Sequence, residues 1–112
     1  MIRVFLPVIA FGGPFFAQAR EDFLNVPGGP VWYRVSGNGT GIPLLVLHGG
    51  LGGTSCGSAA LAPLSSRRKL VDYDQLGSGR SGRSTKRTLW RVERFVEELD
   101  AVRKQLGLKR IR

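Results

Sequence analysis

The apolar positions of this chain fall into short runs separated by glycine-rich segments, a pattern typical of buried strands joined by turns. Val31–Val35 is rich in β-branched and aromatic residues and follows the turn sequence Pro27–Pro30. Ile42–Leu47 is continuously apolar, as expected for a strand covered on both faces. Leu70–Asp74 is the next such run. We therefore expect strands at these three places.

The remaining pattern predicts two helices. Ser58–Leu64 fits a short one. Further along, Asp100 and Lys104 are spaced as a helical i,i+4 ion pair, and Gly107 is a natural helix stop. The alternation of strands, loops and helices predicts an α/β fold whose sheet has parallel strands. Apolar residues that recur at spacings of three and four, and so share one face of the second helix, are Leu89, Val92, Phe95, Leu99, Val102 and Leu106.

The first nineteen residues have the pattern of a secretory signal peptide. Arg3 gives a positive start, Val4–Phe16 is almost wholly apolar, and Ala17–Ala19 fits a small-x-small cleavage site. The apolar run is shorter than the ~20 residues of a membrane-spanning helix. We expect cleavage after Ala19, a mature domain over residues 20–112 that is not membrane-bound, and a periplasmic or secreted location.

Composition excludes several kinds of site. A single cysteine, Cys56, excludes an internal disulfide, and a single histidine, His48, excludes a multi-histidine metal centre. The formal net charge of +9 leaves a nucleic-acid-binding alternative, but no aromatic residues are interleaved with the basic ones as in a stacking platform. We therefore expect neither a metal nor a nucleic-acid partner. The residues on which the nucleic-acid alternative would rest are Arg80, Arg83, Lys86, Arg87 and Arg91.

The first candidate motif is the loop His48–Gly53, which follows the apolar run Leu44–Leu47. A loop with almost no side chains can direct backbone N–H groups at a developing negative charge, as acyl transfer requires. In α/β-hydrolases one such donor lies in a His-Gly-Gly loop after the third strand. A plain glycine-rich turn is the alternative interpretation.

The second motif, Asp74–Ser81, overlaps a near match to a phosphate-binding P-loop over Gly77–Ser84. Arg83 stands where the P-loop has lysine, and a planar guanidinium does not replace a compact ammonium. The helical pattern also begins well past the loop, near Thr88. A nucleotide-binding module therefore remains only as an alternative function.

The third motif, Gly53–Gly57, matches Gly-x-Ser-x-Gly literally. A nucleophile elbow places its serine directly after a strand, whereas a glycine-rich loop separates Ser55 from the apolar run. The only histidine, His48, also lies upstream. We therefore expect Ser55 to be a loop or helix-capping residue, and His48 to anchor its loop by hydrogen bonding rather than act as a base.

Together, the runs GIPLLVLHGGLGG, LVDYDQLGSGRS and LWRVERFVEELDAVRKQLGL resemble the N-terminal third of prolyl aminopeptidases (proline iminopeptidases) of the α/β-hydrolase superfamily. The resemblance implies an α/β-hydrolase sheet with the order strand–strand–strand–helix–strand–helix, truncated before the nucleophile elbow. It also implies a serine hydrolase that releases N-terminal proline, or a similar residue, from peptides and uses no cofactor. Leu51 replaces the family's usual proline and Leu76 its frequent arginine, so an α/β-hydrolase of other ester or amide specificity stays open.

The same resemblance assigns roles to a few positions. The backbone N–H of Gly50 is the oxyanion donor, Gly49 and Gly50 contact the substrate, and the segment Asp74–Gln75 shapes the neighbouring loop. The nucleophile, acid and base of the family follow later in the chain than Arg112. We therefore expect the 112-residue chain alone to be inactive and at best marginally stable, with apolar surface exposed at Ile42–Leu47 and Leu70–Tyr73.

Overall fold

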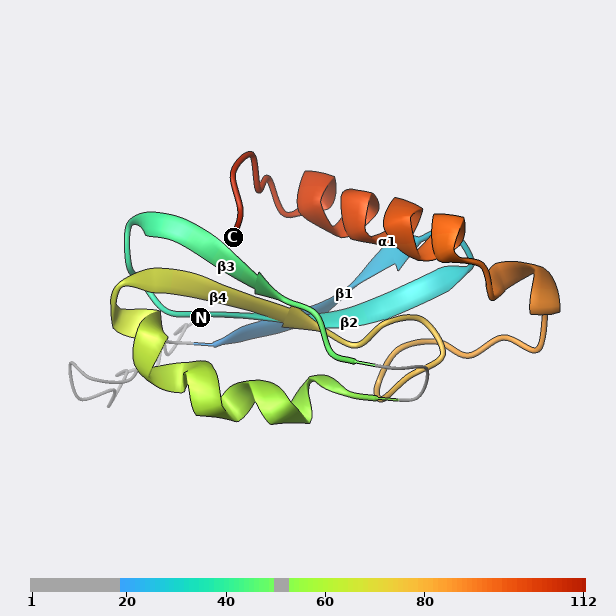
Figure 1. Cartoon of the computed structure of the whole chain (residues 1–112), viewed down its shortest axis with the longest axis horizontal. Helices are drawn as coiled ribbons and strands as arrows, with labels where there is room; N and C mark the ends of the chain where they lie inside the picture. The colour runs from blue at the N-terminus through green and yellow to red at the C-terminus, as the bar shows by residue number, and fades with distance from the viewer. Residues whose placement is uncertain (1–18, 50–52) are drawn as a thin grey trace, which may run out of the picture.

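The computed structural model describes residues 19–49 and 53–112. It contains one four-stranded sheet in the order β1-β2-β4-β3, with α1 on one face and the 3-10 helix η1 on the other (Figure 1). The order of elements along the chain is the predicted one, three strands, a helix, a strand and a helix. The predicted signal peptide lies outside the described residues, apart from Ala19.

Three of the strands confirm the apolar runs. β2 spans Gly29–Ser36, β3 spans Gly41–Val46 and β4 spans Arg68–Tyr73. The expectation of parallel strands is right only for β3 and β4, because β2 pairs antiparallel with both β1 and β4. β1 and β2 are joined by a two-residue turn, which imposes antiparallel pairing.

The strand β1, Arg20–Val26, was not located from the sequence. Its first half is polar and exposed, and only Leu24 and Val26 reach the core. Two alternating apolar positions are too few to distinguish a strand from an extended loop. Because β1 lies at the edge of the sheet, its polar half faces solvent without cost.

The 3-10 helix η1, Ser55–Ser66, is longer than the predicted Ser58–Leu64 and packs beside β4. Thr54 is its N-cap, and the Thr54 hydroxyl accepts a hydrogen bond of 3.3 Å from the N–H of Cys56. After β4 a second 3-10 turn, η2, covers Arg87–Leu89. None of the helices in the described residues is long and apolar enough to cross a membrane.

The helix α1, Val92–Gln105, begins four residues later than expected from the pattern near Thr88. Its C-terminal features are confirmed, since Gly107 has a φ of 67° and Lys104 Nζ lies 2.7 Å from Asp100 Oδ2. The apolar stripe is only partly buried. Val102 is in the core, but Val92 is 75% exposed, and the deepest positions facing the sheet include Arg94 and Glu98.

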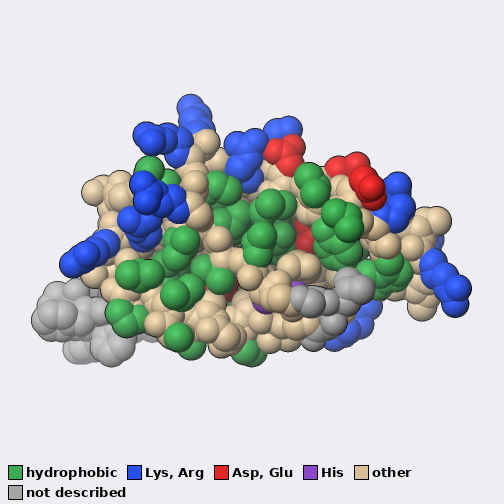
Figure 2. All heavy atoms as spheres, in the orientation of Figure 1, with side chains coloured by type: hydrophobic (Ala, Val, Ile, Leu, Met, Phe, Trp, Pro, Cys, Tyr) green, Lys and Arg blue, Asp and Glu red, His purple; other side chains and the backbone are tan. Residues whose placement is uncertain are grey.

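The core lies between α1 and the sheet and includes Val31 and Tyr33 of β2, Tyr73 of β4 and Val102 of α1. The expected exposure of Leu70–Tyr73 is wrong, because β4 is an inner strand flanked by β2 and β3. β3 is half-buried at the sheet edge, and the expectation that it is covered on both faces is also wrong in the described residues. Figure 2 shows apolar side chains gathered on the face between β3 and α1, where Leu47 and Val96 are exposed.

Candidate functional site

Two glycine-rich loops meet at one edge of the sheet. One begins at His48 after β3, and the other begins at Asp74 after β4. Because β3 and β4 are adjacent and parallel, their carboxyl ends lie side by side, the position at which open α/β sheets bind ligands. The topology therefore brings together the first two motifs of the sequence.

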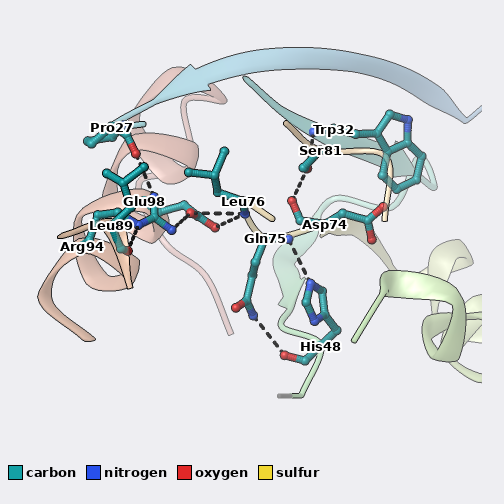
Figure 3. Close-up of polar contacts among 10 residues, drawn as sticks. All are labelled: Pro27, Trp32, His48, Asp74, Gln75, Leu76, Ser81, Leu89, Arg94 and Glu98. Carbon is teal, nitrogen blue, oxygen red and sulfur yellow. Dashed lines mark hydrogen bonds and ion pairs between the residues drawn. The ribbon is translucent and has the colours of Figure 1, made fainter. Parts of the chain in front are cut away.

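A pair of hydrogen bonds joins the loops (Figure 3). The backbone N–H of Gln75 donates to His48 Nε2 at 2.9 Å, and the Gln75 side-chain amide donates to the His48 carbonyl oxygen at 3.0 Å. A ring nitrogen that accepts a hydrogen bond carries no proton, so we infer that the proton is on Nδ1, which lies 3.4 Å from the Gly49 carbonyl oxygen. His48 therefore anchors its loop, as expected, and its Nε2 lone pair is already occupied.

The carboxylate of Asp74 organises the second loop from its centre. Asp74 is buried; its Oδ1 accepts from the N–H of Ser55 at 2.8 Å, and its Oδ2 accepts from the N–H of Arg80 at 3.0 Å. Burial by itself would raise the pKa of Asp74, but the N–H groups of Arg80 and Ser55 outweigh it and hold the pKa below its ordinary value. Asp74 is therefore ionised at neutral pH, where it accepts the hydrogen bonds that hold the loop and does not act as a proton donor.

Two further contacts fix the same loop. The Ser81 hydroxyl donates to the Asp74 carbonyl oxygen and accepts from the N–H of Trp32 at 2.9 Å, which ties the loop to β2 (Figure 3). Gly79 has a φ of 49°, and a Cβ at that position would lie 2.2 Å from Asp74 Oδ2. Only glycine allows the backbone to fold over the carboxylate in this way.

The predicted oxyanion donor, Gly50, and the neighbouring Leu51 lie outside the described residues. Gly49 is described and exposed, and a Cβ there would meet nothing within 4 Å. A cavity of about 260 Å³ lies between this loop and η1, lined by residues that include His48, Gly49 and Ser55. It places open volume beside the backbone of the first loop.

Ser55 does not lie on a nucleophile elbow. It is the first residue of η1, is buried, and its N–H is bonded to Asp74 Oδ1. The residue that caps η1 is Thr54, one position earlier than the expected capping serine. In residues 19–49 and 53–112, no group of three His, Cys, Asp or Glu residues could hold a metal ion.

The structure does not support a phosphate-binding loop at Gly77–Ser84. The Arg83 guanidinium donates to the carbonyl oxygens of Gly77 and Gly79, at 3.0 and 3.2 Å. The N–H of Arg80, which a phosphate would need, is bonded to the Asp74 carboxylate. In addition, α1 begins at Val92, too far along the chain for its N-terminus to complete such a loop.

Some of the basic residues on which the nucleic-acid alternative rests make contacts within the chain. Arg80 stacks over the Trp32 ring at 4.4 Å, and Arg91 Nε donates to the Thr88 carbonyl oxygen at 3.0 Å. Together with Arg83, three of the five are engaged with their own chain. All five side chains nevertheless remain exposed, so these contacts do not remove their positive charge from the surface.

Sequence reasoning missed Arg94 and Glu98, which form an ion pair beneath the second loop. Both are almost completely buried, and the backbone N–H of Leu76 points at the Glu98 carboxylate. The signal was present in the sequence. Two opposite charges spaced i,i+4 fall in line with the buried Val102 on the core-facing side of α1, where an apolar residue is the norm.

No protein-family model matches the chain. It is 44% identical over 92 residues to the proline iminopeptidase of Heyndrickxia coagulans, and the match covers 81% of this chain and 32% of that protein. The crystal structure of a proline iminopeptidase-related protein from Thermus thermophilus has a TM-score of 0.77 at 28% identity, covering 84% of this chain and 34% of that chain. A loop variant of a haloalkane dehalogenase from Bradyrhizobium elkanii has a TM-score of 0.71 at 24% identity, covering 84% of this chain and 30% of that chain, and this likeness shows the fold alone.

Strand order, paired loops and these likenesses define the N-terminal part of an α/β-hydrolase. Within that class, the sequence is similar to proline iminopeptidases, which confirms the resemblance inferred from its motifs. The chain spans about a third of the length of the proteins that it matches.

Proposed function

We propose that this chain supplies the oxyanion-loop edge of a proline iminopeptidase-like serine hydrolase that releases N-terminal proline, or a similar residue, from peptides. The observation that carries the proposal is the His48–Gln75 pair of hydrogen bonds, which holds two glycine-rich loops together at the carboxyl edge of parallel strands. The similarity to proline iminopeptidases supports the substrate class.

In this proposal the backbone N–H of Gly50 stabilises the oxyanion, and Gly49 contacts the substrate beside it. An N–H aimed at the oxyanion stabilises the negative charge more than water does, because the N–H is already oriented when the charge develops. Gln75 has a positioning role, since its two hydrogen bonds fix the first residue of the loop that contains Gly50.

The 112-residue chain alone should not turn over substrate. Its only histidine, His48, has Nε2 engaged by the Gln75 N–H, and Ser55 is buried at the start of η1. A nucleophilic serine needs a base within hydrogen-bond reach, and this sequence has no second histidine to provide one. Incubation with proline 4-nitroanilide should release 4-nitroaniline at the rate of a protein-free blank, and a faster rate would contradict this part of the proposal.

The DNA downstream of the Arg112 codon tests the assignment directly. We expect a Gly-x-Ser-x-Gly elbow to be encoded there, in frame or after a frameshift. If it is absent from every reading frame, the proposed role in a serine hydrolase is wrong.

A chain extended through that elbow and the following domain should hydrolyse proline 4-nitroanilide, and replacement of the elbow serine by alanine should abolish the activity. Comparison with alanine 4-nitroanilide and 4-nitrophenyl acetate distinguishes an iminopeptidase from a hydrolase of other amide or ester specificity. Preference for the acetate would leave the α/β-hydrolase class intact and overturn the proline assignment.

The proposed location is the periplasm or the extracellular space, reached through a signal peptide of residues 1–19. Support comes from the sequence pattern and from β1, which begins at Arg20, directly after the predicted cleavage point. N-terminal sequencing of protein recovered from the culture medium or periplasm should begin at Arg20. Recovery of uncleaved chain in the cytoplasm would contradict the proposal.

A further inference from the structure

The buried ion pair Arg94–Glu98 is linked to the candidate site by hydrogen bonds on either side of the peptide bond that joins Gln75 and Leu76. Glu98 accepts the N–H of Leu76 with both carboxylate oxygens, at 3.3 and 3.4 Å. The preceding residue, Gln75, makes both hydrogen bonds to His48. Figure 3 shows these contacts, which run from α1 through the second loop to the histidine ring.

Arg94 fixes the carboxylate from the other side. Its Nη2 donates to Glu98 Oε2, its Nε donates to the Leu89 carbonyl oxygen at 2.8 Å, and its Nη1 donates to the Pro27 carbonyl oxygen at 2.8 Å. The guanidinium therefore joins three segments, the β1–β2 turn, η2 and α1. A planar fork with all of these bonds leaves the carboxylate little freedom to rotate.

Burial of both charges argues that stability is not the reason for this arrangement. Glu98 is 0% exposed and Arg94 2%, and removing two charges from water costs more than most ion pairs regain. A pair of apolar side chains at the same positions would bury equally well. The carboxylate does something that an apolar residue cannot: it holds the peptide unit between Gln75 and Leu76 in one orientation.

We propose that Arg94 and Glu98 are positioning residues that set the orientation of Gln75 and, through it, the tautomer and placement of the His48 ring. Their hydrogen bonds reach the first loop only through the second. The inference concerns how the loops are held, so it goes beyond the proposed function and stands or fails independently of any catalytic activity.

The single histidine makes the test direct, because every imidazole nitrogen signal of the protein belongs to His48. Long-range ¹H–¹⁵N correlation spectra of the full 112-residue chain are recorded at a pH above the range in which imidazole protonates. The wild-type chain should show one protonated nitrogen, Nδ1, and one unprotonated acceptor, Nε2. In Glu98→Gln, the Nε2 signal should shift toward the protonated position and the separation between the two nitrogens should shrink.

Two variants bracket the measurement. Gln75→Ala removes the side-chain donor to the His48 carbonyl oxygen but keeps the backbone N–H that bonds Nε2, so it should shift the ring signals while Nε2 stays the unprotonated acceptor. Asp100→Asn removes a carboxylate of the same helix that pairs with Arg103 and Lys104 at the surface, and it should leave the His48 signals unchanged.

A folded Glu98→Gln chain with the wild-type His48 spectrum would overturn the proposal, since a merely structural ion pair lowers stability without moving the tautomer. If Glu98→Gln does not fold, Arg94→Lys provides the same test, because lysine keeps the charge but cannot reproduce the three-way fork. Unchanged signals in folded Arg94→Lys would equally overturn the proposal, and a shift of the Nε2 signal toward the protonated position would support it.

Discussion

The two loops at the carboxyl edge of the sheet are both rich in glycine, yet they are held in different ways. The loop after β4 is fixed from within, by the Asp74 carboxylate and by Ser81. The described residues of the loop after β3 are tied to the rest of the protein through His48 and its two hydrogen bonds with Gln75. The difference teaches that the first loop takes its position from the second, so damage should pass from the second loop to the first and not in reverse.

The largest effect is expected from Asp74→Ala. Loss of the carboxylate leaves the buried N–H of Ser55 and the part-buried N–H of Arg80 without their acceptor. Each unsatisfied buried donor costs about 1–3 kcal/mol, so the loss of two acceptors should lower the free energy of unfolding by about 2–6 kcal/mol. Urea denaturation followed by circular dichroism measures the change, and a loss smaller than that of the His48 variant below would contradict the comparison.

The stability that the Asp74 carboxylate contributes should be lost in acid. Because the folded protein holds the pKa of Asp74 below its ordinary value, the carboxylate stabilises the fold above the unfolded pKa of about 3.9, and this contribution disappears as the pH falls through the folded pKa. Asp74→Asn should flatten this part of the stability profile. Asp100→Asn is the matched control: hydrogen bonds from Lys104 and Arg103 also lower the pKa of Asp100, but its side chain is half-exposed and its pairs are weak.

A glycine from each loop gives an intermediate test. Gly79→Ala would push a methyl group into the Asp74 carboxylate at a positive φ, and we expect a loss of about 1–3 kcal/mol in the free energy of unfolding. Gly49→Ala meets open space and should change it by less than about 0.5 kcal/mol. Equal effects of the two substitutions in thermal unfolding would remove the distinction between the loops.

Among the substitutions that remove or disturb a contact, the smallest effect should come from His48→Ala. It removes the acceptor of the Gln75 N–H, but the site is partly exposed and water can replace the ring nitrogen. The expected loss is about 0.5–1.5 kcal/mol, the net value of an ordinary hydrogen bond. Amide hydrogen exchange of Arg80 and Ser55 should stay slow in this variant, and fast exchange there would show that the second loop depends on the first.

The sequence alone located the elements that carry a clear local pattern. The runs that became β2, β3 and β4 are apolar enough to be located without a structure, and Gly107 marks the end of α1. β1 was missed because its burial is confined to Leu24 and Val26. The buried face of α1 was misjudged at Val92, which is exposed, whereas Arg94 and Glu98 take up buried positions on the helix.

The candidate site was predictable only as two separate loops. Family resemblance indicated that Asp74 and Gln75 shape the loop beginning at His48, but the actual bonds depend on the parallel register of β3 and β4. The role of Glu98 depends on contacts between segments more than twenty residues apart in sequence, at Leu76 and Glu98, which no local pattern encodes. Three-dimensional register is therefore the information that the sequence alone lacked.

The strand order β1-β2-β4-β3 also has a consequence for the kinetics of folding. The β1–β2 hairpin closes a short loop, and its loop-closure entropy is small. β4 pairs with β2, for example Tyr73 with Tyr33, although β3 and η1 lie between the two strands in the sequence. Until β4 has paired, β3 has no neighbouring strand in the sheet. Such non-local pairing is slow. During that interval the apolar strand Gly41–Val46 is an unpaired edge, so early aggregation should start from β3, the segment that leads directly into the loop beginning at His48.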